Sequence, residues 1–155
     1  MLNCEYHDSL PKDFSLLEEH KCSIEPAPIN LIESVNHKEE VWHIEFSDDG
    51  KIMLVATKDS SIGIWEIKSE VDMEYNIKKV VQLNNTHREN LNKIVFSPDS
   101  NFFLTCSSDC TLNLFKSTGE HVKTYRAHRG PIYSAVWFKN SLEFLSISTD
   151  CTMKK

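Results

Sequence analysis

Histidine, hydroxyl and aspartate side chains recur three times along the 155-residue chain at a fixed spacing. A histidine beside an aspartate and a hydroxyl is the residue set of a catalytic triad, in which the imidazole takes the hydroxyl proton. The sets are His37, Thr57 and Asp59; His87, Ser107 and Asp109; and His128, Ser148 and Asp150. Threefold repetition in one register favours structure over catalysis. We expect each histidine and aspartate to pair and lock a loop against strands.

The cysteines raise the question of a metal site. Cys106 and Cys110 have a C-x3-C spacing, and His121 and His128 follow, a set that nominally resembles zinc ligands. However, Cys110 and Cys151 both come directly after an aspartate, in matching DCT triplets, which a structural repeat explains. We therefore expect no metal, no cofactor and no catalytic residue, so the chain is predicted not to be an enzyme. A metal- or thiol-dependent enzyme is the remote alternative.

The composition favours a globular protein of the cytoplasm or nucleus. Hydrophobic residues make up 40% and charged residues 26% of the chain, and the net charge of −6 argues against nucleic-acid or membrane partners. The N-terminal MLNCEYHDSLPKDF lacks the apolar segment of a signal peptide. Five cysteines are an odd number, and in a reducing compartment we expect no structural disulfide.

Apolar residues recur at fixed offsets from the three histidines and predict the strands that position them. Four, seven and nine residues after each histidine come Val41, Leu91 and Ile132; Ile44, Ile94 and Ala135; and Phe46, Phe96 and Trp137. KIMLVAT and FFLTCSS are strand-like runs bounded by turn residues, and KKVVQL and HVKTY fit a fourth strand. Four short antiparallel strands in about 40 residues form the blade of a β-propeller.

The units resemble the WD-repeat family, in which a Trp-Asp dipeptide closes the third strand of each blade. The matching dipeptides here are the degenerate Trp65-Glu66 and Phe115-Lys116. The resemblance implies an all-β propeller of about three blades, and it adds Trp65 to the first buried relay of His37, Thr57 and Asp59. It places an N-terminal extension at 1–30 and the propeller at 31–155, with repeats at about 31–66, 78–116 and 121–155.

Residues 15–65 also resemble the junction in the WD-repeat subunit of the GID/CTLH ubiquitin ligase. HKC (20–22) and EVW (40–42) carry the discriminating part of the resemblance. It implies a non-catalytic scaffold or substrate-recruiting subunit in ubiquitin-dependent degradation, with ligase subunits or substrates as partners. The LisH and CTLH regions that such subunits use for assembly are missing from this sequence. A WD-repeat scaffold of another complex, or a non-functional fragment, are the alternatives.

The third unit ends before its closing aromatic, which the repeat places at 128 + 28 = 156. Lys155 stands where Ile64 and Leu114 place apolar side chains. Since propellers generally need about 4 to 8 blades, we expect a partial or truncated ring with open edges and exposed apolar faces. The alternative is a short protein that completes itself with a partner or by self-association through its open blades.

Three residues are candidates for binding a protein partner. Trp42 and Tyr133 each lie five residues after a histidine, and Lys58 comes directly before Asp59, which are positions near one face of a propeller. The aromatic side chains are candidate binding anchors, and the alternative is that they pack beneath a neighbouring blade. The segment EIKSEVDMEYNIKK (66–79) is expected to be a charged loop between the third and fourth strands.

Overall fold

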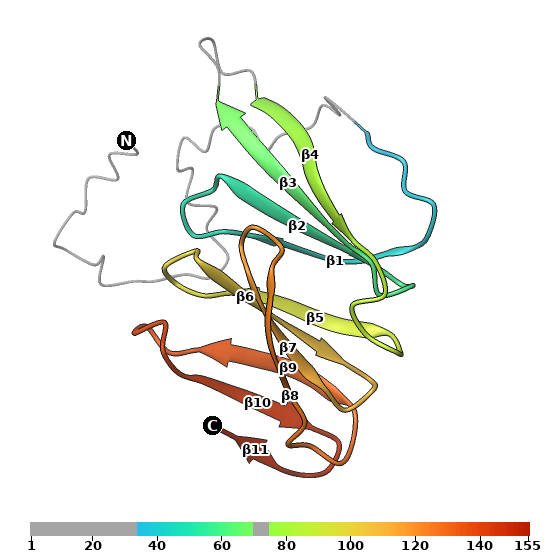
Figure 1. Cartoon of the computed structure of the whole chain (residues 1–155), viewed down its shortest axis with the longest axis vertical. Helices are drawn as coiled ribbons and strands as arrows, with labels where there is room; N and C mark the ends of the chain where they lie inside the picture. The colour runs from blue at the N-terminus through green and yellow to red at the C-terminus, as the bar shows by residue number, and fades with distance from the viewer. Residues whose placement is uncertain (1–33, 70–74) are drawn as a thin grey trace, which may run out of the picture. The chain divides into compact units, whose positions relative to one another are not determined.

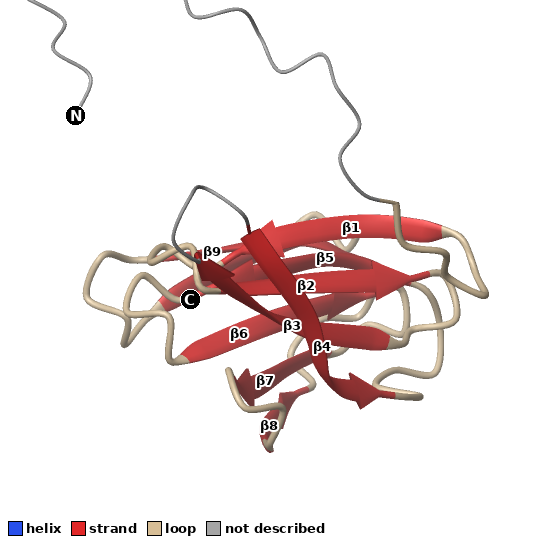
Figure 2. Ribbon diagram, turned by 90° about the horizontal axis from the view of Figure 1, so that it is seen from above, coloured by secondary structure: helices blue, strands red, loops and turns tan. Residues whose placement is uncertain are grey.

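The computed structural model describes residues 34–69 and 75–155, which contain eleven strands and no helix. The expected N-terminal extension, with its HKC residues, lies outside the described residues. The strands form three antiparallel sheets (Figure 1), and a view from above shows only strands and loops (Figure 2). No helix in the described ranges has the length and hydropathy to cross a membrane.

Each sheet is a meander in which strands adjacent in the sequence pair side by side. The first sheet contains β1 (Val41–Phe46), β2 (Ile52–Thr57), β3 (Ile62–Ser69) and β4 (Tyr75–Leu83). The second contains β5 (Leu91–Phe96), β6 (Phe102–Ser107), β7 (Leu112–Lys116) and β8 (His121–Tyr125). The third contains β9 (Ile132–Trp137), β10 (Phe144–Ser148) and β11 (Met153–Lys154). This is the succession of all-β propeller blades that the repeat predicts.

A tight turn joins the first two strands of each sheet. In the first sheet the Ser47 hydroxyl donates to Asp49 Oδ1 at 2.6 Å, and Gly50 adopts a φ of 68°. The equivalent residues Ser100 and Ser141 adopt φ values of 59° and 54°. These turns need a left-handed residue, and glycine adopts that conformation without the strain of a Cβ.

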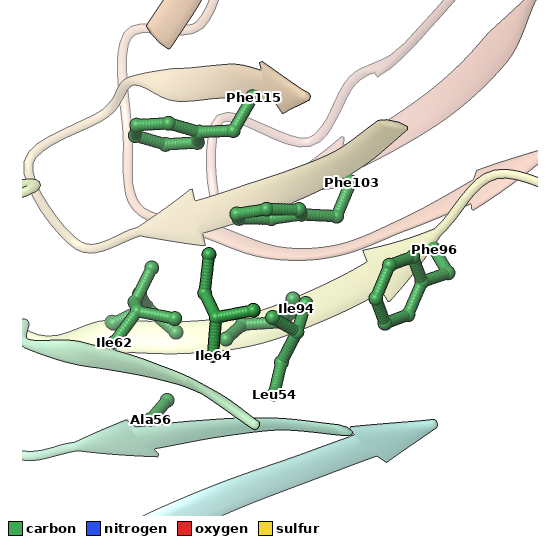
Figure 3. Close-up of a cluster of buried hydrophobic side chains, with 9 residues drawn as sticks. Leu54, Ala56, Ile62, Ile64, Ile94, Phe96, Phe103 and Phe115 are labelled. Carbon is green, nitrogen blue, oxygen red and sulfur yellow. The ribbon is translucent and has the colours of Figure 1, made fainter. Parts of the chain in front are cut away.

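The first hydrophobic core lies between the first and second sheets (Figure 3). The Phe103 ring stacks on Phe115 with 5.2 Å between ring centroids, and Phe96 meets Phe103 edge-on at 5.9 Å. Aliphatic side chains of the first sheet point at these rings. The buried members of this core are Leu54, Ala56, Ile62, Ile64, Leu91, Ile94, Phe96, Phe103 and Phe115.

A second core lies between the second and third sheets. Its buried members are Val95, Leu104, Cys106, Leu112, Ile132 and Ala135. Tyr125, Trp137 and Phe144 pack around it, and both other rings meet Phe144 edge-on. The middle sheet is therefore covered on both faces, whereas each outer sheet has one face in a core.

The segment expected to be a charged loop between β3 and β4 is mostly sheet. Ile67 pairs with Ile77 and Lys68 with Asn76, so the pairing of β3 with β4 continues past Trp65, where the repeat places the end of the third strand. Only residues 70–74 lie outside the described part of this hairpin. The alternation of polar and apolar residues continues past Trp65, and cross-strand pairing satisfies the backbone groups that a loop would leave to water.

Candidate functional site

A histidine relay links the loop before β5 to the β6–β7 turn in the second sheet. His87 Nδ1 lies 3.2 Å from Asp109 Oδ2, and its Nε2 lies 2.7 Å from Thr105 Oγ1. Asp109 also accepts from the Arg88 amide at 3.0 Å and from the Thr111 hydroxyl at 2.6 Å. The imidazole is fully buried with both nitrogens partnered, so it ties the loop to the sheet.

The third sheet repeats this relay contact for contact. His128 Nδ1 lies 2.9 Å from Asp150 Oδ2, and its Nε2 lies 2.9 Å from Ser146 Oγ. Asp150 accepts from the Arg129 amide at 3.0 Å and from the Thr152 hydroxyl at 2.6 Å. Two unlike stretches of sequence thus build one geometry, as a structural repeat requires.

The hydroxyl that contacts each histidine differs from the one that the sequence suggests. The predicted relay members Ser107 and Ser148 bind loop backbone, at Asn90 O (3.0 Å) and Gly130 O (2.8 Å) respectively. The histidine partners Thr105 and Ser146 lie two residues earlier on the same strands, described above. Since residues two apart share a strand face, all four point the same way, and depth in the sheet decides which hydroxyl reaches the imidazole. The sequence signal that could have identified these partners is a hydroxyl residue four positions before Asp109 and before Asp150.

The environment of the second relay shifts the pKa of both its ionisable groups. Burial lowers the pKa of His87, and the opposing attraction of Asp109 does not offset it. Burial raises the pKa of Asp109, but hydrogen bonds from Thr111 and Arg88 outweigh it, and the net shift is downward. The network therefore fits a neutral imidazole that donates from Nδ1 to a carboxylate and accepts from Thr105 at Nε2.

The first sheet does not form this relay. Thr57 and Asp59 do bond, at 2.6 Å between Oγ1 and Oδ1, but the His37 ring packs instead against Trp65 with 6.0 Å between centroids. Val55 stands at the position of Thr105 and Ser146, so the hydroxyl that would bind an imidazole nitrogen is missing.

Trp65 itself is buried with an unpartnered Nε1. A Cβ on Gly63 would lie 2.8 Å from that Nε1, so the glycine gives the indole the space it occupies. The predicted indole donor of the first relay thus packs as an apolar ring.

The three candidate partner-binding residues are exposed, and two of them are joined through Glu40. Trp42 Nε1 donates to Glu40 Oε2 at 3.1 Å, and Lys58 Nζ to Glu40 Oε1 at 3.2 Å. Trp42 is 44% exposed and Tyr133 is 57% exposed. Both aromatic side chains are therefore accessible in the part of the chain that the structure describes, where the sheet of Trp42 has no blade before it.

A β-bulge sets the place of each of these aromatic side chains in its strand. The register shifts between Val41 and His43 in β1, and the same irregularity recurs in β5 and β9. The extra residues are Trp42, Asn92 and Tyr133. A bulge turns its extra side chain away from the regular alternation, so these three side chains stand at equivalent places in their sheets. Trp42 and Tyr133 are exposed there, whereas Asn92 is half-buried and donates to Ile132 O at 2.8 Å.

The described cysteines, Cys106, Cys110 and Cys151, are free thiols. Cys110 and Cys151 have φ values of 64° and 60°, and Ser60, after Asp59, has 61°. Their place in the repeat is thus a left-handed turn position. In residues 34–69 and 75–155 no group of three or more histidine, cysteine or acidic side chains could hold a metal ion. The side chains of the relay histidines His87 and His128 are buried, and both ring nitrogens of each have a partner, which suits them to hold structure.

The three bulged sheets, of which the second and third each hold a histidine relay, are blades of a β-propeller, and comparison with known proteins identifies their family. The WD domain, G-beta repeat family matches residues 30–66 and 78–116. The RRP9 WD40 repeats, a solved structure, superpose with a TM-score of 0.67 at 16% identity, over 77% of this chain and 36% of that one. The chain therefore belongs to the WD40 repeat family. The third blade lies outside the family match, and its relay geometry places it in the same series.

Two curated relatives come from Arabidopsis thaliana. The WD repeat-containing protein 26 homolog is 27% identical over 150 residues, which are 96% of this chain and 25% of the relative. The WD repeat-containing protein WDS homolog is 28% identical over 151 residues, 95% of this chain and 28% of the relative. The chain thus spans about a quarter of the length of these relatives. WD-repeat proteins are generally protein-interaction scaffolds, and the propeller fold is typically non-catalytic.

Proposed function

We propose that this chain is a protein-interaction module that binds its partner through the face carrying the bulged residues Trp42, Asn92 and Tyr133. The observation that supports it is the exposure of two large aromatic side chains on rigid strands. Aromatic anchors of this kind dominate binding energy at protein interfaces, because they bury much area and lose little conformational entropy. The Glu40 contacts with Trp42 and Lys58 orient the indole before a partner arrives.

We further propose that the partner belongs to a GID/CTLH-type ubiquitin ligase, in which the chain acts as a scaffold or substrate-recruiting part. The resemblance of residues 15–65, with EVW at 40–42, supports this assignment. Trp42 is part of that motif and also one of the exposed aromatic residues. We place the protein in the cytoplasm or nucleus, and its net charge of −6 favours protein partners over nucleic acid or membranes.

The test is binding of the full chain to a purified ligase of this type that lacks its own WD-repeat subunit. We expect saturable binding that a Trp42→Ala, Tyr133→Ala double variant weakens at least tenfold, as loss of two anchors implies. Val122→Ala, at a 45% exposed valine on β8, is the control and should bind as the wild type does.

Two results would contradict the proposal at different points. A folded chain that does not bind the ligase would remove the ligase assignment and favour a scaffold of another complex. Binding that the double variant leaves unchanged would remove the bulged face as the binding site. Far-ultraviolet circular dichroism of every variant establishes that the sheets are intact.

A further inference from the structure

The interface between neighbouring blades is built twice inside this molecule, each time from the same repeat positions. Between the first and second sheets, Leu54, Ala56 and Ile62 meet Ile94 and Phe96. Between the second and third sheets, the equivalent Leu104, Cys106 and Leu112 meet the third sheet's Ile132 and Ala135. Every blade therefore has a leading face, which meets the blade before it, and a trailing face, which meets the blade after it.

The leading face of the first sheet has no blade against it in the described structure. Ile44 and Phe46 occupy the repeat positions of Ile94 and Phe96, with Met53 beside them on β2. Ile44 and Phe46 are 49% and 52% exposed, whereas Ile94 and Phe96 are 0% and 7% exposed. Residues of the type that forms a core in the next blade thus face solvent here.

The trailing face of the third sheet likewise has no blade against it in the described structure. Ile147 and Met153 are 48% and 66% exposed, and Val136 on the same face is 53% exposed. The residues of the first sheet that are equivalent to Ile147 and Met153, namely Ala56 and Ile62, are completely buried. This face therefore offers the half of the blade interface that the leading face of the first sheet lacks.

Polar contacts fix the register at both internal interfaces. His43 Nε2 lies 3.0 Å from Ile94 O between the first and second sheets. Lys93, at the equivalent position, donates from Nζ to Ser134 Oγ at 3.1 Å between the second and third sheets. The blade interface is thus a specific surface with directional bonds as well as an apolar patch, which allows a defined pairing in place of a general apolar association.

We propose that two copies of this chain associate head to tail, the leading face of the first sheet of one copy packing on the trailing face of the third sheet of the other. The contact continues the blade interface that the molecule already uses twice. It is heterologous, because the two surfaces differ, and such contacts either close a ring of copies or extend into an open chain of copies. The driving force is removal of the exposed apolar side chains from water.

Two singly blocked variants test the proposal by sedimentation velocity over the micromolar range. Ile44→Asp with Phe46→Asp blocks the leading face, and Ile147→Asp with Met153→Asp blocks the trailing face. We expect the wild type to associate with rising concentration and each variant alone to stay monomeric. An equimolar mixture of the two variants should double in mass and stop there, because only one intact leading face and one intact trailing face remain.

Val122→Asp is the control. It adds a negative charge at an exposed valine of β8, in the middle sheet, which carries neither end face, and should associate as the wild type does. A wild type that stays monomeric throughout overturns the proposal. So does a mixture of blocked variants that remains monomeric while the wild type associates, or a blocked variant that still associates alone. Circular dichroism checks that all variants fold, which the exposure of the substituted side chains favours.

Discussion

At the residue scale, the buried histidines are stable because each polar atom around them has a partner. His87 is enclosed by Thr105, Asp109 and Thr111, and Asn113 also approaches its Nε2 at 3.4 Å. When a buried polar atom loses its hydrogen-bond partner, the folded protein is destabilised, because the atom has been removed from water without a hydrogen bond in exchange. The relay is therefore sensitive to single changes that leave the shape of the site intact.

Thr105→Val keeps the shape of the side chain and removes the hydroxyl at His87 Nε2. We expect the free energy of unfolding to fall by about 1 to 2 kcal/mol, measured by urea denaturation. Thr149→Val, at an exposed threonine of the turn between β10 and β11, is the control and should change it by less than about 0.5 kcal/mol. Equal effects of the two substitutions would show that the contact of the Thr105 hydroxyl with His87 does not stabilise the fold.

The pKa shift of His87 predicts a loss of stability in mild acid. Because its pKa in the folded protein lies below the usual 6.5, the unfolded chain binds a proton more readily. The stabilisation is complete above about pH 6.5 and is lost as the pH falls through the folded pKa. The lowered pKa of Asp109 moves its own contribution below pH 3.8, in a separate range.

Nuclear magnetic resonance titration of the His87 imidazole checks this directly, because it follows this one side chain. We expect a midpoint below that of a histidine in an unfolded peptide. Thermal melting of a His87→Asn variant should show a weaker decrease in stability between pH 7 and 5 than the wild type. A His87 midpoint at or above the unfolded value would contradict the prediction.

At the scale of elements, the β1–β2 turn depends on a left-handed residue. Gly50 has a φ of 68°, and a Cβ built there would touch nothing within 4 Å. Gly50→Ala should therefore cost only the conformational strain, about 1 to 2 kcal/mol of unfolding free energy. The reverse change, Ser100→Gly at the equivalent turn, should cost nothing or stabilise. Thermal denaturation of both variants provides the comparison, and a neutral Gly50→Ala would contradict it.

At the scale of the whole molecule, the middle sheet is the most protected part. β6 has a core on each face, and Leu104, Thr105 and Cys106 are all completely buried. We expect its amide hydrogens to exchange with solvent more slowly than those of β10, where Ile147 is 48% exposed. Hydrogen exchange followed by mass spectrometry measures the order, and equal protection of the two strands would contradict it.

Much of this fold was predictable because a repeated sequence gives each local signal three times. The offsets of apolar residues from the histidines predict the strands and their order, and the aspartate positions predict the tight turns. The aspartate partners of His87 and His128 were predictable, but their hydroxyl partners Thr105 and Ser146 were not. The spacing gives a face of the strand, and only the depth of the imidazole in the sheet selects one of two hydroxyl side chains on that face.

The sequence by itself determined that this chain builds antiparallel blades, since period-two alternation and left-handed turns are local properties of the backbone. Only the tertiary structure decided that His37 packs against Trp65 and does not bond to Asp59. It also decided that the charged segment after Trp65 extends a hairpin, and that Trp42 and Tyr133 stand at exposed bulges. Each of these three outcomes depends on packing or hydrogen bonding with a neighbouring strand or ring. Contacts between residues distant in the chain have no local signal, so they become visible only when the sheets are packed together.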